Sequence, residues 1–386
     1  MVLDFTLTDE QRALKQMARE FALKEFPHYS KRCDDKEEYP FELMKKAAAQ
    51  GLLGIGIPSA YGGAGLGMME SAICAEELNA IDAGLALCIF AADFGTEAII
   101  RLGTEEQKQK WLTPIPKGEM ISGAAISEAG AGSDVAGATC TAEKKGNDYV
   151  LNGSKMWITN GDVADYFITL VATDPKNPKP HARFSLVVVE KEAKGFKANK
   201  IHGKLGIRAS DTAELQFTDC HIPKANLLGE EGKGFYYVME FFNNTRIGVA
   251  AQGVGIAQGA LNVATQYAKD REAFGKPIAD LQAIQFKLAE MATRAETARL
   301  LTYKAAWHND QGKPNPQASS MAKWWAGRAA CENADECVQI LGGMGYVDEM
   351  PAEKFYRDAK ITEIYEGTKE VHKLIIARSL LGKLKG

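Results

Sequence analysis

The residues best suited to acid–base chemistry stand near the C-terminal end of the chain. Glu366 lies between Tyr365 and Gly367, with Thr368 next, shortly after the run Arg-Asp-Ala-Lys-Ile at 357–361. A glutamate whose surroundings raise its basicity can remove a proton from a weakly acidic carbon, if the developing negative charge is stabilised. Most glutamates are only solvated, so Glu366 is a candidate base that needs support from the rest of the chain.

Four further segments carry residue types that suit a large, partly anionic ligand. Small residues let backbone N–H groups approach a ligand closely, tryptophan offers a flat wall, and arginine presents a planar fork of donors to phosphate. Each segment also has a plain structural reading: a tight turn, core packing, a surface cap and a helix stop. The segments are 125–134 with Ser127 and Ser133, 156–160 with Trp157 and Thr159, 270–282 with Arg271, Phe274 and Gln282, and 339–346 with Gln339, Gly342 and Gly343.

These segments lie in three parts of the chain, and the parts together predict an α+β fold. Residues 1–121 are expected to form an N-terminal helical domain. Residues 122–228 contain strand-like runs without intervening helices, which predicts a central antiparallel β-barrel or sandwich rather than βαβ units. Residues 229–386 carry apolar side chains at helical spacing and predict a C-terminal four-helix bundle.

Local signals predict individual elements within these parts. Thr8 and Gln11 form a capping box that starts a helix, and residues 68–79 are expected to form another. Residues 82–102, rich in small and apolar side chains, are expected to form one helix that is buried on most sides. The Asn-Gly pair at 152–153 separates two β-prone runs and predicts a hairpin turn.

The composition narrows the class of protein. The 386 residues carry a net charge of −4, and the basic residues are dispersed, so no nucleic-acid partner is expected. We find no charged N-terminal region followed by an apolar run, and no stretch of about 20 apolar residues that would span a membrane. We therefore expect a cytoplasmic, prokaryotic protein, with a processed organelle protein as the alternative. The seven cysteines contain no CxxC pair, and no metal site is predicted.

Taken together, the five segments resemble the acyl-CoA dehydrogenase family, and the resemblance covers nearly the whole chain. It implies a flavoprotein that binds FAD and desaturates an acyl-CoA thioester between Cα and Cβ. Glu366 would remove the α-proton while flavin N5 takes the β-hydride, and the electrons would pass to an electron-transfer flavoprotein. Some branched- and long-chain members carry their base on an earlier helix, where this chain has Thr245. The resemblance therefore implies Glu366 as the base.

The resemblance also implies roles for the other residues. Cofactor contacts are implied for Ser127, Trp157, Thr159, Arg271, Phe274, Gln282, Gln339, Gly342, Gly343 and Thr368. Substrate contacts are implied for Ser133, Arg246, Tyr365 and Gly367. In the family the segments at 270–282 and 339–343 reach FAD bound by a neighbouring subunit, which implies a homotetramer built as a dimer of dimers.

The sequence leaves the identity of the acyl group undecided, and the reason is Asp93. This residue lies in a stretch that resembles the wall of the family's acyl pocket. Its carboxylate either turns to solvent or faces the pocket, where its pKa would rise. We expect a short-chain or alicyclic, cyclohexane-type acyl-CoA substrate. One alternative is 1,4-dehydrogenation of a cyclic enoyl-CoA with Asp93 as a catalytic base. No arginine occurs between 83 and 100, which argues against a glutaryl group.

Three other readings stay open at this stage. An acyl-CoA oxidase would keep the fold and pass its electrons to O₂. A helical scaffold could bind flavin or CoA without catalysis, although Glu366 accompanies every cofactor segment. A nucleic-acid-associated relative is disfavoured by the net charge of −4.

Overall fold

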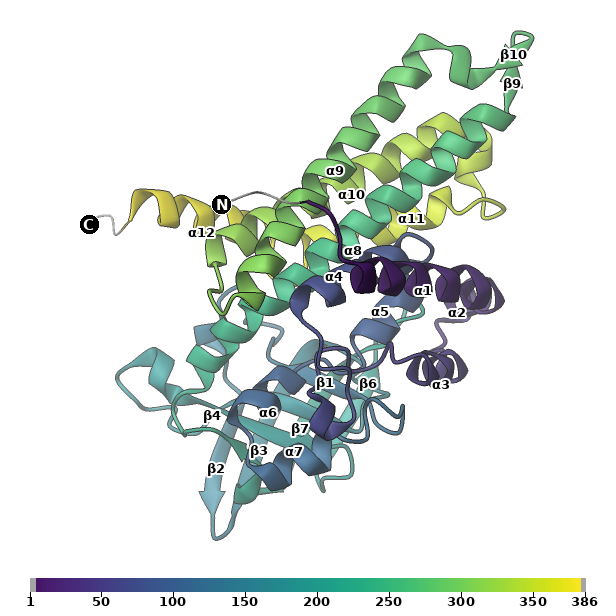
Figure 1. Cartoon of the computed structure of the whole chain (residues 1–386). Helices are drawn as coiled ribbons and strands as arrows, with labels where there is room; N and C mark the ends of the chain where they lie inside the picture. Colours follow the sequence, from purple (N-terminus) through teal and green to yellow (C-terminus); the bar gives the residue numbers. More distant parts are fainter. Residues whose placement is uncertain (1–4, 383–386) are drawn as a thin grey trace.

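Helices flank a central sheet in the protein, whose computed structural model describes residues 5–382. The N-terminal helices come first in the chain, the sheet follows, and long C-terminal helices complete the molecule (Figure 1). This order of helical, β and helical parts confirms the predicted fold class. The N-terminal helices are α1 (Asp9–Glu25), α2 (Ser30–Lys36), α3 (Phe41–Ala49), α4 (Met68–Asn79), α5 (Ala83–Phe90), α6 (Thr96–Leu102) and α7 (Glu105–Trp111).

The start of α1 shows how local sequence directs the helical part. The Gln11 backbone N–H donates to Thr8 Oγ1 at 3.2 Å, and the Thr8 backbone N–H donates to Gln11 Oε1 at 3.1 Å. This reciprocal pair satisfies two backbone donors that a helix start leaves without partners. The predicted capping box is confirmed, and α4 spans the predicted residues 68–79.

The single helix expected across residues 82–102 is broken between α5 and α6. Asp93 forms an isolated parallel β-bridge with Ser122, whose backbone N–H donates to the Ala92 carbonyl at 2.8 Å. The backbone then turns at Gly95, where φ is 95° and glycine is favoured. The Ala92 carbonyl is therefore hydrogen-bonded to the sheet, although a continuing helix would need it as an acceptor. The break places Asp93 beside the sheet rather than on a helix.

The central part is one mixed sheet. Its strands are β1 (Ser122–Ala125), β2 (Thr141–Lys145), β3 (Asp148–Thr159), β4 (Tyr166–Ala172), β5 (Phe184–Glu190), β6 (Phe196–Lys200), β7 (Thr212–Pro223) and β8 (Leu227–Leu228). They follow the order β6-β7-β3-β2-β4-β5-β8, and β1 pairs with β4. Most neighbours are antiparallel, as predicted, but β1 and β2 each pair with β4 in parallel. The sheet does not close into a barrel in the described residues.

The Asn-Gly pair does not form the predicted hairpin turn, because β3 continues through it. The Asn152 side chain instead accepts a hydrogen bond from the Asp219 backbone N–H on β7 at 2.9 Å. Gly153 has φ of 139°, and a Cβ there would lie 2.8 Å from Cys140 Cα. A register shift at this point gives a β-bulge. The β2–β3 turn lies earlier, at Gly146, where φ is 60°.

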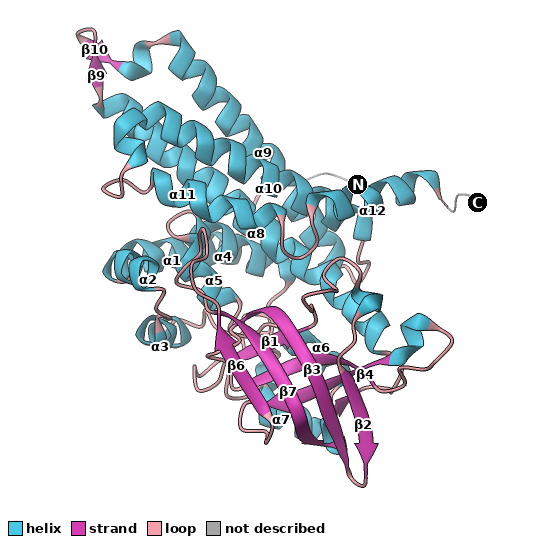
Figure 2. Ribbon diagram, turned by 180° about the vertical axis from the view of Figure 1, so that it is seen from behind, coloured by secondary structure: helices cyan, strands magenta, loops and turns pink. Residues whose placement is uncertain are grey.

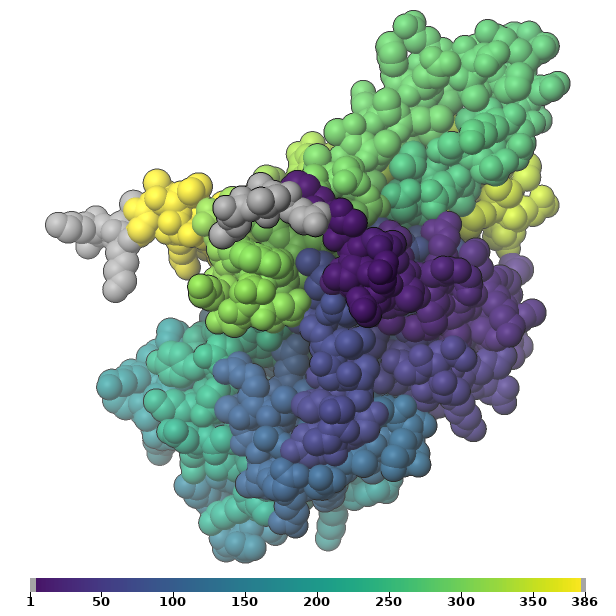
Figure 3. Space-filling model, in the orientation of Figure 1, coloured from purple at the N-terminus to yellow at the C-terminus, as the bar shows by residue number. Residues whose placement is uncertain are grey.

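The C-terminal part is a bundle of long helices. Its elements are α8 (Gly234–Asp270), β9 (Glu272–Ala273), β10 (Lys276–Pro277), α9 (Gln282–Asp310), α10 (Pro316–Leu341), α11 (Ala352–Ala359) and α12 (Lys369–Leu381). The helices α8, α9 and α10 pack on one another, and α4 packs on α8 and α9. Figure 2 shows the sheet as a separate layer beneath these helices. The N-terminal helices and the sheet form one continuous mass, from which the far end of the bundle projects (Figure 3).

The helix α8 joins the sheet to the bundle and forms much of the core. Its composition and length, 37 residues, would allow it to cross a membrane, and it is the one such helix among the described residues. However, 67% of its most apolar window is buried inside the protein. The apolar surface of α8 is therefore used in packing, which is typical of a core helix.

Candidate active site

A cavity of about 440 Å³ lies where α4, α5 and α6 meet α8, the end of β3 and the Glu366 segment. Its walls contain Leu87, Ile89, Phe90, Phe94, Ile100 and Phe241 among the apolar residues. The polar lining includes Asp93, Glu97, Thr159, Thr245, Tyr365 and Glu366. The fold thus brings four of the predicted site residues, Asp93, Thr159, Tyr365 and Glu366, around one space. An apolar cavity with a few convergent polar groups is typical of a small-molecule site.

Glu366 is held at the cavity wall by contacts from α8. Thr245 Oγ1 donates a hydrogen bond to Glu366 Oε2 at 2.5 Å. Burial raises the pKa of the Glu366 carboxyl, while the Thr245 hydrogen bond and the charges of Arg246 and Lys323 act in the opposite direction. A carboxylate with a raised pKa is a stronger base than one in water. The environment of Glu366 therefore suits proton abstraction.

The residues around Glu366 hold its backbone in an unusual conformation. Glu366 has φ of 54° and Gly367 has φ of 94°, so both lie in the left-handed region. The Tyr365 hydroxyl donates to Gln252 Oε1, and Thr368 caps α12 by accepting from the Val371 backbone N–H at 3.4 Å. A non-glycine residue in this region costs of order 1 kcal/mol or more and persists only where its neighbours impose it.

Two more carboxyl groups face the cavity. Burial raises the pKa of Asp93 to about 6 and that of Glu97 to about 7, and the Asp93 and Glu366 charges add to the rise at Glu97. Asn244 Nδ2 donates to Glu97 Oε2 at 3.1 Å. Both residues are partly exposed, and both line the cavity. Of the two orientations open for Asp93, the structure shows the one that faces the pocket.

The cations near the cavity are already engaged. Arg101 lines the cavity, but its guanidinium donates to Glu240 Oε2 at 2.6 Å. Arg246 is 8% exposed, lies over the Phe242 ring at 5.9 Å, and donates to Asn243 Oδ1 at 3.2 Å. Its Nε has no partner among the described residues. Arg246, for which the resemblance implies a substrate contact, is buried, and its charge acts on the Glu366 carboxyl.

The glycine-rich run at 125–134 is fastened to β3 by a buried ion pair. Lys155 Nζ lies 2.9 Å from Glu128 Oε1, and Glu128 also accepts from the Cys140 backbone N–H at 3.0 Å. The Met156 backbone N–H donates to the Ser127 carbonyl at 2.9 Å. These contacts hold Ser127 beside the end of β3. Ser133, in contrast, lies on the exposed outer part of the run.

Trp157 presents a large aromatic surface near the cavity. It lies two residues before Thr159, which lines the cavity, and its side chain is 64% exposed. Its backbone is left-handed, with φ of 65°. A tryptophan that is fixed by a strand and yet uncovered is a surface on which a flat ring could stack.

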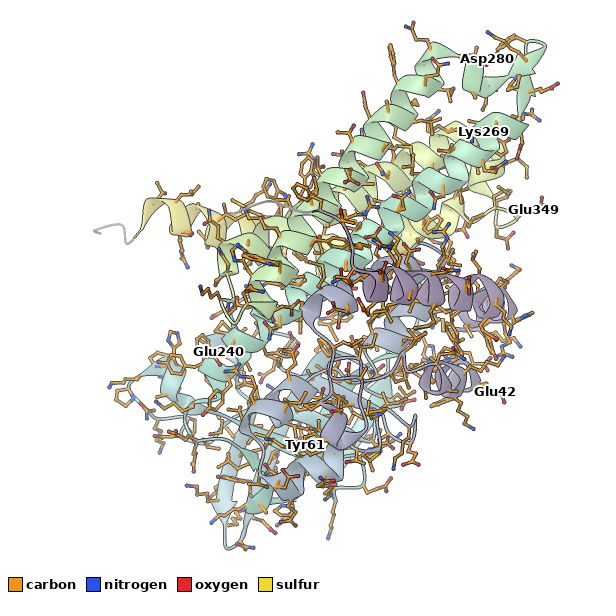
Figure 4. All side chains as sticks on the ribbon, in the orientation of Figure 1. Glu42, Tyr61, Glu240, Lys269, Asp280 and Glu349 are labelled. Carbon is orange, nitrogen blue, oxygen red and sulfur yellow. The ribbon has the colours of Figure 1, made fainter. Side chains whose placement is uncertain are left out.

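The remaining predicted residues form a second group at the far end of the bundle. Arg271 and Phe274 lie in the β9–β10 hairpin, between Lys269 and Asp280, which Figure 4 labels at the end of the bundle remote from the sheet. Because α9 and α10 are joined by a short loop and run antiparallel, the end of α10 returns to this region. The other members are Gln282, Gln339, Gly342 and Gly343, all exposed. One chain therefore does not bring this group to Glu366.

Comparison with known proteins assigns the chain to a family. Three adjoining family descriptions match it: "Acyl-CoA dehydrogenase, N-terminal domain" at 8–119, "middle domain" at 123–220 and "C-terminal domain" at 232–381. The chain belongs to the acyl-CoA dehydrogenase family. This confirms the resemblance found in the sequence and places the chain among flavin-dependent oxidoreductases.

Similar proteins cover the chain from end to end. The mitochondrial short-chain specific acyl-CoA dehydrogenase of Rattus norvegicus is 44% identical over 97% of this chain and 91% of its own length. The structure of butyryl-CoA dehydrogenase from Megasphaera elsdenii has a TM-score of 0.94 and 40% identity, covering 98% of this chain and 100% of that one. A chain in a structure described as the electron transferring flavoprotein of Acidaminococcus fermentans has a TM-score of 0.96 and 43% identity, covering 99% and 100%.

The residues present fit the FAD on which acyl-CoA dehydrogenases depend. Trp157 offers an uncovered aromatic face two residues before Thr159, which lines the cavity, and Phe274 is 91% exposed at the far end of the bundle. At Gly342 and Gly343 a Cβ would meet nothing within 4 Å, so their backbone is open to a ligand. These surfaces match what a flat ring and a pyrophosphate require.

Sequence reasoning missed several residues of this acyl-CoA dehydrogenase site. Glu97 had a usable signal, because it follows Asp93 by four residues and would share its face on a helix. Arg101 lies one residue beyond the stretch 83–100, which contains no arginine. The Lys155–Glu128 pair and the buried Lys323 gave no local signal, since their partners are distant in sequence.

Proposed function

We propose that this chain desaturates a short-chain or alicyclic acyl-CoA thioester between Cα and Cβ, with Glu366 removing the α-proton. The observation that carries the proposal is the Glu366 carboxyl, which faces a cavity of about 440 Å³ and has its pKa raised by burial. Bound FAD would supply the acceptor for the β-hydride and hold the electron pair. We further propose that the cofactor contacts are those named above, including Ser127, Thr159 and Thr368.

The backbone at Glu366 supports a role in stabilising the enolate. Among the described residues, the Glu366 backbone N–H has no protein acceptor. A backbone donor placed beside the base can bond the thioester oxygen as negative charge develops on it. Proton removal and charge stabilisation would then come from the same residue, which the strained backbone holds in place.

The chemistry of the cavity favours an uncharged acyl group. Asp93 and Glu97 would repel an acyl chain that ends in a carboxylate, and Arg101 is already paired with Glu240. A similar solved structure is described as a glutaryl-coenzyme A dehydrogenase. For this chain the lining argues against such a substrate and for a short aliphatic or cyclohexane-type group.

The test replaces the Glu366 carboxylate with an uncharged amide of nearly the same shape. Glu366→Gln should keep the purified protein yellow and lower the rate of flavin bleaching by butyryl-CoA or cyclohexanecarboxyl-CoA by at least about a hundredfold. Glu363→Gln is the matched control, since Glu363 pairs with Lys360 at 2.5 Å and does not line the cavity. A rate near that of the unaltered protein in Glu366→Gln would refute the assignment.

One observation favours a second candidate reaction. Asp93 shares the cavity with Glu366, and burial raises its pKa to about 6, as a second base would require. The reaction would be 1,4-dehydrogenation of a cyclic enoyl-CoA, with Asp93 removing the remote proton. Cyclohexenecarboxyl-CoA should then bleach the flavin of the unaltered protein and fail to do so in Asp93→Asn. Equal rates in both proteins would exclude Asp93 from catalysis.

We infer that the electrons leave through an electron-transfer flavoprotein rather than through O₂. The support is the similarity to a chain from the Acidaminococcus fermentans structure described above. Protein reduced by acyl-CoA without oxygen should be reoxidised rapidly by an electron-transfer flavoprotein and slowly by air. Fast reoxidation by air, with hydrogen peroxide as product, would identify an acyl-CoA oxidase instead.

A further inference from the structure

Lys323 is a buried cation that the proposed chemistry has not yet used. It lies on α10, its side chain is 1% exposed, and its ammonium makes no ion pair with any described residue. Its Nζ donates to the Gly367 carbonyl at 2.6 Å. Burying an ammonium without a paired carboxylate is costly. A buried ammonium at this position therefore indicates a function that offsets its desolvation cost.

The bond from Lys323 completes a set of three anchors around the base. Thr245 binds the Glu366 carboxylate, the Tyr365 hydroxyl binds Gln252, and Lys323 binds the carbonyl of Gly367. Each anchor comes from a long helix, either α8 or α10. The residue before the base, the base itself and the residue after it are thus each tied to the bundle.

The helix α10 is a close and rigid support for this segment. Gly327, one turn after Lys323, would place a Cβ 2.9 Å from the Thr362 carbonyl, so the helix backbone approaches the segment directly. On the other side, a Cβ at Gly367 would lie 3.1 Å from His372 Nε2. The left-handed conformations at Glu366 and Gly367 are therefore enclosed between α10 and α12.

We propose that Lys323 is a positioning residue for proton abstraction, whose buried ammonium holds the Gly367 carbonyl so that the Glu366 carboxylate stays aimed into the acyl cavity. The inference rests on the proposed function of Glu366 as the base. Misplacement of a reacting group by about 1 Å costs on the order of a hundredfold in rate. The hydrogen bond from Lys323 to the Gly367 carbonyl, one residue after the base, therefore acts directly on the position of the Glu366 carboxylate.

The charge of Lys323 also supports the ionised form of the base. Burial lowers the pKa of Lys323 to about 8, with the nearby Glu366, Glu363 and Glu370 acting to raise it and Arg246 acting to lower it. The ammonium is therefore charged at neutral pH. Its charge opposes the rise that burial causes in the pKa of Glu366.

Other titratable groups around Glu366 lie on several elements that pack against the site. Arg246 on α8 acts in the same sense as Lys323, and Asp93 and Glu97 line the same cavity as Glu366. His372 on α12 is neutral, because burial first and then the Lys323 and Arg246 charges lower its pKa to about 3. Losing Lys323 leaves Arg246 as the one cation that acts on the Glu366 carboxylate among the described residues.

Two variants separate the effect of the hydrogen bond to the Gly367 carbonyl from the effect of the Lys323 charge. Lys323→Met removes both, whereas Lys323→Gln removes the charge and keeps an amide donor for the Gly367 carbonyl. Lys373→Met is the matched control, because it makes the same change in net charge at an exposed lysine of α12 over the Trp324 ring. Each purified flavoprotein is mixed with butyryl-CoA without oxygen, and the rate of flavin bleaching is followed against pH.

We expect Lys323→Met to bleach about 10- to 100-fold more slowly than the unaltered protein at its best pH. In both Lys323 variants the acidic limb of the rate profile should move to higher pH, because the Glu366 carboxylate loses a stabilising charge. Lys323→Gln should retain more of the plateau rate than Lys323→Met. Lys373→Met should match the unaltered protein in rate and profile.

The results distinguish this inference from the proposed function. If the unaltered protein is not bleached by any acyl-CoA, or if Glu366→Gln is as fast, the proposed function fails. If Glu366→Gln is slow but both Lys323 variants keep the normal rate and acidic limb, only the role of Lys323 is overturned. If Lys323→Met does not fold, Lys323→Gln decides alone. Loss of fold in both variants, with Lys373→Met intact, also overturns the role, since Lys323 would then serve stability.

Discussion

At the scale of the residue, three carboxyl groups share one cavity and burial raises the pKa of each. The charges of Asp93 and Glu366 add to the rise in the pKa of Glu97. Such an arrangement costs stability at neutral pH, because charged groups are held where water is scarce. Natural sites commonly accept that cost for function.

Glu97→Gln should therefore stabilise the protein at alkaline pH. The pKa of Glu97 rises from 4.5 to about 7 on folding, so the folded state binds the proton more tightly and stability falls as pH increases through this range. Glutamine cannot ionise and keeps an acceptor for Asn244. We expect a free energy of unfolding higher by about 1–3 kcal/mol at pH 8, measured by urea denaturation.

The gain in Glu97→Gln should shrink as pH falls and vanish near pH 4, where both proteins are neutral at this position. Glu240→Gln, on the exposed surface of α8, should show no comparable gain. A gain at Glu97 that is the same at pH 4 and pH 8 would contradict the electrostatic explanation.

At the scale of the element, α8 positions the site by packing unusually closely on its neighbours. Small residues on two of its turns face the N-terminal helices. A Cβ at Gly255 would lie 2.5 Å from the Glu76 carbonyl, and one at Gly259 would lie 2.3 Å from the Ala80 carbonyl. These contacts are with backbone, which cannot move aside easily. The close approach keeps Thr245 and Arg246, two to four turns earlier on the same helix, beside Glu366.

Gly259→Ala should separate α8 from α4 and lower the free energy of unfolding by about 1–3 kcal/mol. Gly248→Ala is the matched control on the same helix, since a Cβ at Gly248 meets nothing within 4 Å. It should raise stability by about 0.5–1 kcal/mol, because alanine favours the helix. Urea denaturation measures both. Equal effects of the two substitutions would show that close packing at Gly259 is not important.

At the scale of the whole molecule, the residues implied in FAD binding fall into two groups at different ends of the bundle. One group, with Trp157 and Thr159, adjoins the cavity, and the other, with Arg271 and Phe274, lies at the projecting end (Figure 1). We propose that a second subunit brings the two together, as in the expected dimer of dimers. Phe274 and Tyr346, 91% and 84% exposed, are large aromatic surfaces that such an interface would cover.

Phe274→Ala should weaken FAD binding and subunit association with little effect on the fold of the single chain. The reason is that Phe274 makes little contact within its own chain. Sedimentation and the fluorescence of released flavin would measure the two effects. Phe41→Ala is the control, because Phe41 is 53% exposed on α3, beside Glu42 and far from Asp280 in Figure 4. Unchanged flavin retention and assembly in Phe274→Ala would contradict the role of a second subunit.

Sequence alone determined those features whose interactions are local. The capping box of Thr8, the bounds of α4 and the helical, β and helical order follow from neighbouring residues and from the period of apolar positions. The base candidate Glu366 and the cofactor segments were recognisable from their resemblance to the acyl-CoA dehydrogenase family. Each of these motifs is a short run of neighbouring residues, so the sequence displays it directly.

Only the tertiary structure decided which distant segments meet. Contact with Ser122 breaks the expected helix at Asp93, and pairing with β7 continues β3 through Asn152 where a turn was expected. Likewise, Asp93 lines the same cavity as Glu366, and Lys323 binds the Gly367 carbonyl, because the fold brings these segments together. The physical reason is the same in each case. The partner of a backbone group or a charge is set by tertiary packing, and the local sequence does not specify it.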